Sequence, residues 1–272
     1  MTPVRKAVVL AAGRGSRMRR PEPGAGLDPG QEAAADDGGK AMMPIHGRPF
    51  PDPVLSGLAD AGLTDVFLVV RPGYDAIRAH YTAHRPRRLR LAYGIQPEPL
   101  GTANALLSAE AFAGPEEFLT LNADNAYPVG AYRALSELGG PGLVVFERER
   151  LLAKSNFPKE RVAQFAVLAV GGDGFLERIL EKPEEKDLAA SAGEVLLSMN
   201  LWRFSPRIFE ACRRVPPSAR GELELPQAVG WAIENLGERF RTLRSGEGVL
   251  DLSTRADVAA VSARLRGVEA RP

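Results

Sequence analysis

The sequence predicts an α/β protein in which helices flank a mixed, mainly parallel sheet. Short apolar runs alternate with amphipathic segments between residues 54 and 146. An apolar, β-branched run near the start of the chain passes directly into a glycine turn. Strands that alternate with helices in this way indicate βαβ units with right-handed crossovers. A sheet of this kind binds its ligands beyond the carboxyl ends of its strands, which is where the glycine turn lies.

Residues 8–18, VVLAAGRGSRM, change from apolar to basic within a few positions. Gly13 and Gly15 have no Cβ, so the backbone can turn sharply and point its amide N–H groups at phosphate oxygens. Arg17 would add a planar, permanently charged donor for the same phosphates. A Rossmann fingerprint would need a third glycine where the chain has Met18, and a P-loop needs Gly-Lys-Ser/Thr. The structural alternative is an ordinary strand-to-turn junction beside a solvated arginine cluster.

Residues 21–39 form the one low-complexity segment. Pro, Gly, Asp and Ala dominate it, and Leu27 is its single large apolar residue. A segment of this composition buries too little apolar surface to offset its ordering entropy. We therefore expect a flexible insertion, which ends where Lys40 begins a more structured stretch.

The later elements follow from periodicity. Apolar runs predict strands at 65–70, 89–93, 118–121 and 143–146, and helical spacing predicts helices near 54–58 and at 74–84, 102–111 and 132–138. The second half changes style, with longer strands at 162–170, 175–181 and 195–204 and helices at 206–213 and 224–235. No linker or internal repeat interrupts this order, so we expect one domain over residues 1–272.

Two aspartates lie at predicted strand ends. Asp124 follows the strand at 118–121, and Asp251 follows another apolar run close to the C-terminus. Carboxylates in such positions are suited to a hard cation. The alternatives are a turn-forming aspartate for the first and, for the second, a helix N-terminus in which Ser253 or Thr254 precedes Asp257.

Composition limits the class of function. The 272 residues are 44% hydrophobic and 25% charged, as in an ordinary globular protein, and the formal net charge is +1. No overall field therefore recruits nucleic acid or a membrane surface. Cys212 is the only cysteine, and no apolar stretch approaches a membrane span. We expect a cytoplasmic protein without nucleic-acid or membrane partners, and a homo-oligomer stays open.

Taken together, these stretches closely resemble the motifs of the sugar-phosphate nucleotidyltransferases, the nucleotide-sugar pyrophosphorylases of the glucose-1-phosphate thymidylyltransferase type. Residues 10–18 resemble the N-terminal signature, and residues 40–49 the second signature. Residues 96–105 are similar to the nucleobase motif, and residues 181–183 to the sugar-phosphate motif. The family has Pro before the Lys of the second signature and a shorter gap, whereas this chain has Gly39 and a long one.

The resemblance implies a role for each matched residue. The nucleotide-binding residues would be Leu10, Ala11, Ala12, Gly13, Gly15, Ser16, Gln96, Gly101 and Thr102. The catalytic cations would be Arg17, Lys40 and Lys182. Lys182 would also pair with the sugar phosphate, beside Glu181 on the sugar hydroxyls and Asn200 near the sugar. Asp124 and Asp251 would bind Mg²⁺, the expected cofactor.

The resemblance also implies the fold and the reaction. It implies a single-domain, Rossmann-like fold of the GT-A-like nucleotidyltransferase type, with residues 1–150 mainly binding nucleotide and residues 151–272 mainly binding sugar phosphate. The expected reaction couples a nucleoside triphosphate to a sugar-1-phosphate with release of pyrophosphate. Two alternatives stay open: a non-catalytic nucleotide-sugar sensor, and a nucleotide-sugar-dependent glycosyltransferase.

Overall fold

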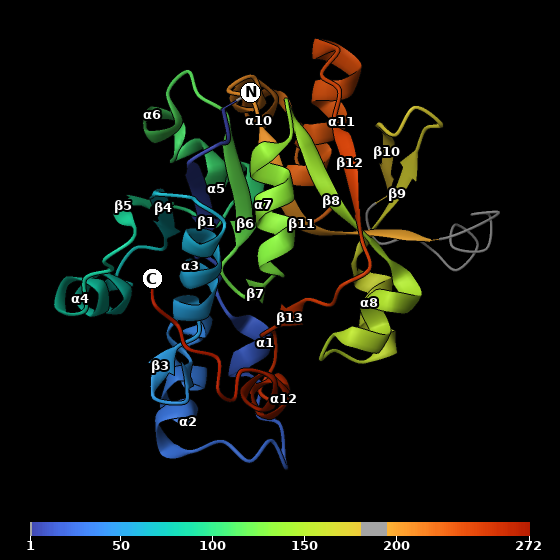
Figure 1. Cartoon of the computed structure of the whole chain (residues 1–272). Helices are drawn as coiled ribbons and strands as arrows, with labels where there is room; N and C mark the ends of the chain where they lie inside the picture. The colour runs from blue at the N-terminus through green and yellow to red at the C-terminus, as the bar shows by residue number, and fades with distance from the viewer. Residues whose placement is uncertain (1, 181–194) are drawn as a thin grey trace.

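One large sheet runs through the molecule (Figure 1). The computed structural model describes residues 2–180 and 195–272, and within these residues the sheet has nine strands. The strands are β1 Lys6–Leu10, β4 Asp65–Val70, β5 Arg90–Ile95, β6 Phe118–Asn122, β8 Gly142–Glu147, β9 Ala166–Val170, β10 Leu176–Leu180, β11 Leu196–Phe204 and β12 Arg241–Ser245. Their order is β10-β9-β11-β6-β1-β4-β5, and β8 joins β11 to β12.

The sheet has a parallel half and a mixed half. β6, β1, β4 and β5 are parallel, and Val9 in β1 aligns with Leu68 on one side and Leu121 on the other. β11 runs antiparallel to β6, β8 and β9, while β12 is parallel to β8. The predicted mixed, mainly parallel sheet is confirmed, and the carboxyl ends of the four parallel strands share one edge.

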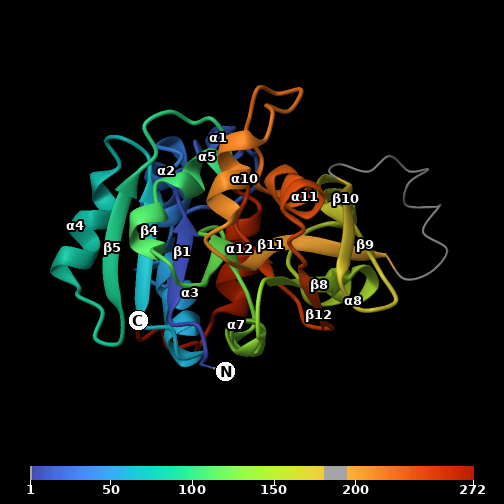
Figure 2. The same cartoon turned by 90° about the horizontal axis from the view of Figure 1, so that it is seen from above.

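Helices cover both faces of the sheet. Figure 2 shows α3 Pro51–Asp60 and α7 Val129–Glu137 on one side, and α5 Thr102–Leu107, α10 Ile208–Arg214 and α11 Leu225–Leu236 on the other. Successive side chains of a strand point to opposite faces of the sheet. Ala7 and Val9 therefore pack into the core on one face, and Val8 packs into the core on the other. Within the described ranges, no helix has the length and apolar character needed to cross a membrane.

Shorter elements complete the chain. They are α1 Ser16–Arg19, α2 Pro29–Asp36, α4 Asp75–Ala83, α6 Glu110–Ala113, α8 Arg148–Lys154, α12 Asp257–Arg264, and the 3₁₀ turns η1 Lys40–Met42 and η2 Lys159–Gln164. Two small ribbons pair β2 Pro44–Ile45 with β3 Arg48–Pro49, and β7 Asn125–Ala126 with β13 Leu250–Asp251. The second ribbon brings the C-terminal part of the chain to the end of β6.

Most of the predicted elements are confirmed to within a few residues, and two differ. The helix predicted over 102–111 is divided into α5 and α6. The strand predicted over 162–170 is wrong in its first half, because η2 occupies Lys159–Gln164 and β9 begins only at Ala166. Val162 is buried as its apolar character indicated, but its neighbour Arg161 is held by two acidic side chains in a turn.

The segment 21–39 differs from the expectation of an unpacked insertion. Helix α2 begins with a capping box in which the Asp28 carboxylate accepts from the Gln31 amide at 2.9 Å and the Gln31 side chain accepts from the Asp28 amide at 3.2 Å. Ala35 is fully buried. Composition misses this because local capping and a distant partner, rather than apolar content, supply the order.

That distant partner is the buried guanidinium of Arg255. Its Nε donates to the carbonyl of Met18 at 3.0 Å, and its terminal nitrogens pair with Glu32 and Asp36 of α2. The Ala256 amide also donates to the Glu22 carboxylate at 2.9 Å. The segment is therefore tied to both the glycine loop and the C-terminal part of the chain.

We predict that Arg255→Met lowers the thermal unfolding midpoint, because the variant leaves the Met18 carbonyl and two α2 carboxylates without their donor. The matched control is Arg213→Met, which removes a similar pair with Glu110 at an exposed position. That exposed pair should contribute little. Equal melting temperatures for wild type and both variants, measured by differential scanning fluorimetry, would show that the Arg255 contacts contribute nothing to stability.

Candidate active site

The glycine loop lies at the carboxyl edge of the parallel strands. The amide of Ala11 donates to Val69 in β4 at 2.8 Å, and the amide of Ala123 donates to Leu10 at 3.0 Å. Gly15 has φ 63°, and a Cβ there would come within 2.2 Å of the Gly38 carbonyl oxygen. A side chain at position 15 is therefore excluded, and the end of the 21–39 segment forms the wall against which the loop packs.

A cleft of about 920 Å³ opens at this edge. It is lined by every predicted nucleotide-binding residue and by four more of the predicted site residues. These lining residues are Leu10, Ala11, Ala12, Gly13, Gly15, Ser16, Gln96, Gly101 and Thr102, together with Arg17, Lys40, Asp124 and Asn200. Glu181 and Lys182 lie outside the described residues. A larger groove of about 1320 Å³ runs between α3, α4 and the C-terminal tail but contains none of the predicted residues.

Two of the predicted catalytic residues, Arg17 and Lys40, donate to protein acceptors within the cleft. Arg17 Nη1 donates to Gln164 Oε1 at 3.1 Å, and Lys40 Nζ pairs with Asp124 Oδ2 at 3.0 Å. The Lys40 and Asp124 side chains are 16% and 27% exposed, so solvent screens this pair only in part. Arg17 and Lys40 therefore both lie at the cleft, each held by one protein acceptor.

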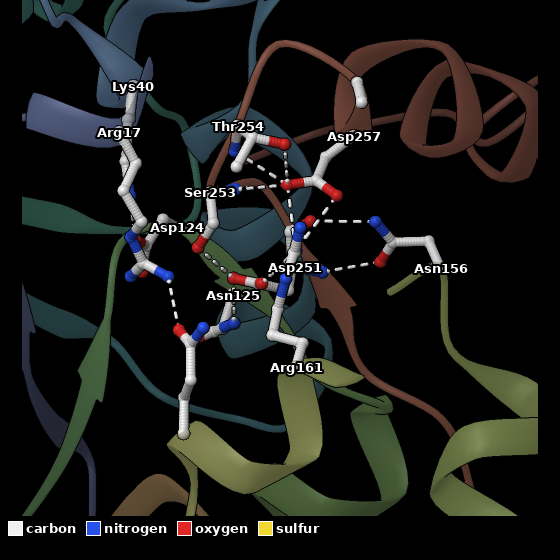
Figure 3. A network of polar contacts seen from close by, with 12 residues as sticks. Arg17, Lys40, Asp124, Asn125, Asn156, Arg161, Asp251, Ser253, Thr254 and Asp257 are labelled. Atoms are coloured by element: carbon white, nitrogen blue, oxygen red, sulfur yellow. Dashed lines mark hydrogen bonds and ion pairs between the residues drawn. The ribbon is translucent and has the colours of Figure 1, made fainter. Parts of the chain in front are cut away.

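The two predicted metal-binding aspartates come together through the β7–β13 ribbon. Asp251 aligns with Asn125, and the amide of Leu252 donates to the carbonyl of Asp124 at 2.9 Å. Figure 3 shows Asp124 near Arg17 and Lys40, and Asp251 further inside among other polar side chains. Asp124 lines the cleft, whereas Asp251 is buried behind it and is not part of the lining.

Asp251 is held on all sides. Its Oδ1 accepts from Asn125 at 3.2 Å and from Ser253 at 3.0 Å, and its Oδ2 accepts from Arg161 at 2.8 Å. The Asn156 side-chain oxygen accepts from the backbone amide of Asp251 at 2.7 Å. Burial raises the pKa of Asp251 above its ordinary value and the nearby Asp124 charge raises it further, while Arg161 acts in the opposite direction. The fold thus holds two repelling carboxylates side by side.

These carboxylates fit a Mg²⁺ site that is completed by its substrate. Mg²⁺ is commonly bound by one or two carboxylates plus substrate phosphates and water, so an all-protein cage is not required. In the described part of the chain, no group of three or more His, Cys, Asp or Glu side chains could hold a metal ion alone. The repulsion between Asp124 and Asp251 is what a cation between them would relieve.

Gln96 is fixed before any ligand arrives. Its Nε2 donates to the Gly101 carbonyl and to Asn104 Oδ1, both at 2.9 Å, so both amide protons are used. Gly101 has φ 106°, and a Cβ there would come within 2.4 Å of the Leu223 carbonyl oxygen. The Gln96 carbonyl oxygen is the part of the side chain left to a ligand.

Asn200 and Thr102 have structural partners as well. Asn200 sits in the left-handed region at φ 59° in a bulge of β11, and its Oδ1 accepts from Trp202 Nε1 at 3.3 Å. The Thr102 hydroxyl accepts from the Leu225 amide at 2.9 Å. Both residues line the cleft, but their side chains also hold the backbone around it.

Sequence reasoning did not find several of the lining residues. They are Tyr74, Gln164, Arg220, Glu222 and Glu224. The sequence could have indicated Tyr74, because this residue follows the carboxyl end of β4, a strand that the apolar pattern predicts. The loop that carries Arg220 carries no such signal, because it reaches the cleft through a non-local contact of Leu223 with Leu100, 2.7 Å from amide to carbonyl.

A family model described as the MobA-like NTP transferase domain matches residues 7–186 of the chain, well over half of its length. The chain belongs to this family. The glycine loop, Lys40, Gln96 and Asp124 all fall inside the matched region of the NTP transferase domain, while Asp251 lies beyond it.

Named relatives of this NTP transferase include two sugar-phosphate enzymes. The chain is 28% identical to a UTP–glucose-1-phosphate uridylyltransferase of Haloferax volcanii, over 96% of each chain. It is 30% identical to a glucose-1-phosphate thymidylyltransferase of Streptomyces griseus, over 89% of this chain and 61% of that protein.

Solved structures match the fold of the NTP transferase almost over its whole length. A UDP-glucose pyrophosphorylase complexed with UDP-glucose is 17% identical and has a TM-score of 0.74, covering 98% of this chain and 100% of the other. A UTP-bound enzyme of the same kind from Acinetobacter baumannii is also 17% identical, with a TM-score of 0.72 and coverage of 98% and 95%. The single-domain nucleotidyltransferase fold is confirmed by these similarities.

We predict that Arg161→Met destabilises the NTP transferase by about 3 to 5 kcal/mol, because it leaves Asp251 and Asp257 buried without their shared cation. Arg161→Lys is the matched control. It keeps a positive charge but not the guanidinium fork that spans both carboxylates, so its free energy of unfolding should fall by a smaller amount. Chemical denaturation in EDTA measures both. Two variants as stable as the wild type would mean that the guanidinium does not hold these aspartates.

The loss in Arg161→Met should also depend on pH. The fold raises the pKa of Asp251 above its ordinary 3.8, so its contribution to the unfolding free energy falls as pH rises from that value to the raised one. Removing Arg161 extends this range upward. The deficit relative to wild type should therefore be smaller near about pH 5 than near about pH 8, and a deficit that is larger in acid would contradict the assignment.

Proposed function

We propose that this chain couples a nucleoside triphosphate to a sugar-1-phosphate, releasing pyrophosphate and forming a nucleotide sugar. The observation that carries the proposal is that the cleft gathers the glycine loop, Arg17, Lys40 and Asp124 at the carboxyl edge of the parallel strands. Membership of the NTP transferase family and the sugar-phosphate activities of the named relatives support it.

The reaction suits a site built from cations. An oxygen of the sugar phosphate attacks the α-phosphorus, the bond from the α-phosphorus to its bridging oxygen breaks, and pyrophosphate leaves with that electron pair. The nucleophile is already an anion near neutral pH, so the reaction needs alignment and charge neutralisation more than a general base. Arg17 and Lys40 would leave Gln164 and Asp124 to hold the triphosphate and stabilise the departing pyrophosphate.

Mg²⁺ and Lys182 complete the proposed machinery. Bound at Asp124 and Asp251, Mg²⁺ would supply charge neutralisation on the reacting phosphates. When Lys40 turns away from Asp124, that carboxylate becomes free to serve as a ligand. Lys182 and Glu181, carried over from the family motif, would hold the sugar phosphate and the sugar hydroxyls.

The nucleobase is proposed to be uracil or thymine. The Gln96 amide protons are both used within the fold, so its carbonyl oxygen would accept from a base that carries an N–H donor. Uracil and thymine both have such a donor at N3, and the named relatives are a uridylyltransferase and a thymidylyltransferase. Glucose-1-phosphate is the first sugar phosphate to test for the same reason.

The experiment is a pyrophosphate-release screen of the four common ribonucleoside triphosphates and dTTP against a panel of sugar-1-phosphates in Mg²⁺. We expect release with UTP or dTTP only when a sugar phosphate is present. Binding of a nucleotide sugar without release would favour the sensor alternative. Transfer of sugar from a nucleotide sugar to an acceptor alcohol would favour the glycosyltransferase.

We predict that Asp124→Asn abolishes turnover and keeps the fold, because it removes a metal-binding charge without changing shape. A loss of at least about two decades in kcat is expected for a ligand of this kind. Asp173→Asn is the matched control, since that aspartate also pairs with a cationic side chain, Arg239, but lies in the β9–β10 turn. An unchanged rate at saturating Mg²⁺ would remove Asp124 from the metal site.

We predict that the two lysines divide between the two substrates. Lys40→Ala should weaken nucleotide binding. Lys182→Ala should raise KM for the sugar phosphate and lower kcat, with little change in nucleotide binding. Loss of one charge-assisted contact corresponds to about one to two decades. Calorimetric nucleotide titration and steady-state kinetics separate the two effects, and equal losses for both substrates in both variants would contradict the division.

A further inference from the structure

One buried hydroxyl at the cleft, that of Tyr74, donates no hydrogen bond to the described residues. Tyr74 follows the carboxyl end of β4, lines the cleft and is only 5% exposed. Its hydroxyl is buried and makes no hydrogen bond within the described residues. The backbone amide of Met42 faces this oxygen and also donates to the Gly39 carbonyl at 2.7 Å. An amide N–H is a donor only, so the phenol proton is left without an acceptor among the described residues. Burial raises the pKa of Tyr74, which keeps that proton on the oxygen.

The ring of Tyr74 is firmly placed. The guanidinium of Arg71 lies over it at 4.6 Å from the ring centre. Arg71 in turn donates to the Asp37 carbonyl at 3.2 Å and to the Asp37 carboxylate at 3.0 Å. Tyr74 is therefore anchored to the chain just before residues 38–40, the segment that delivers Lys40 to the cleft.

The hydroxyl faces this same segment. A Cβ on Gly39 would come within 2.9 Å of the Tyr74 oxygen, so glycine at this position leaves the space that the hydroxyl occupies. A buried donor without an acceptor costs free energy, and such atoms are rare in folded proteins. The Tyr74 hydroxyl therefore costs free energy in this fold, although phenylalanine would fill the same space.

We propose that Tyr74 is a positioning residue for nucleotide binding, an inference that rests on the proposed function. In the ligand-free arrangement Lys40 is held by Asp124, and the Tyr74 proton is unpaired. When Lys40 turns to the triphosphate, the backbone of residues 38–40 shifts, and Tyr74 donates to one of its carbonyl groups. Because this bond forms only in the nucleotide-bound arrangement, it increases nucleotide affinity without adding to the stability of the free protein.

Tyr81 offers a matched control seven residues further along. It is equally buried, but its hydroxyl donates to the Asp52 carboxylate at 2.9 Å, outside the cleft. Tyr74→Phe should therefore weaken binding of UTP or dTTP in Mg²⁺ by about three- to tenfold and leave the melting temperature of the free protein unchanged or higher. Tyr81→Phe should lower the melting temperature and leave nucleotide affinity unchanged. Calorimetric titration and scanning fluorimetry measure the two quantities.

A second variant tests the direction of the contact. Gly39→Ala should also weaken nucleotide binding, because the added methyl group would come within 2.9 Å of the Tyr74 hydroxyl oxygen. In the double variant with Tyr74→Phe the two losses should be less than additive. The KM of the sugar phosphate should not change in Tyr74→Phe.

The possible results separate the two proposals. If the wild type binds UTP or dTTP and Tyr74→Phe binds it equally well, the positioning role is overturned and the proposed function stands. A fall in melting temperature without a change in affinity would likewise make Tyr74 a packing residue only. If the wild type binds neither nucleotide, the proposed function itself fails.

Discussion

The buried guanidinium of Arg161 is the contact on which the active-site geometry depends. It lies between Asp251 and Asp257, at 2.8 and 2.9 Å, and all three side chains are less than 10% exposed. The cation is what allows the chain to return from β12 and pair β13 with β7 beside the carboxylate of Asp124. Without a positive charge at this position, two buried carboxylates and a third at the cleft would repel one another. The acidic side of the cleft is therefore rigid, because one guanidinium pairs with both of its buried carboxylates.

The basic side of the cleft is built differently. Its backbone is fixed where Gly15 packs on the Gly38 carbonyl and Gly38 packs on the Arg14 carbonyl, so closely that neither position accepts a side chain. Arg255 ties the same region to α2, because it donates both to the Met18 carbonyl and to the carboxylates of the helix. Its side chains are less fixed, since Arg17 and Lys40 each have one described acceptor in the cleft. Such contacts can be exchanged for phosphate oxygens at little cost, which suits the role proposed for these cations in holding a triphosphate and then releasing pyrophosphate. A rigid acidic side and exchangeable cations together describe a site whose charges rearrange when substrate enters.

The sequence predicts the sheet and the residues at its edge because both depend on local patterns. Apolar runs in β4, β6 and β8 and the glycines at 13 and 15 need no distant partner to be recognised. Two of the errors share a physical cause. The strand expected over 162–170 fails because Arg161 is drawn into a buried ion network, and the order in α2 comes from a side chain more than two hundred positions away in the sequence. Long-range charged contacts override local propensity at these points, and periodicity cannot reveal them.

Tyr74 illustrates what a sequence motif cannot contain. A tyrosine after a strand is an ordinary packing residue until its hydroxyl is found without an acceptor next to the glycine that precedes Lys40. This atom adds no hydrogen bond to the described fold, and the nucleotide-bound arrangement proposed above would supply the acceptor that it lacks. The long segment before Gly38 fits this view, because its helix and its Arg71 contact hold one end of residues 38–40 while Lys40 exchanges partners at the other. If Lys40 exchanges partners as proposed, the insertion holds one end of the segment that carries it, and the order in α2 then contributes to nucleotide binding.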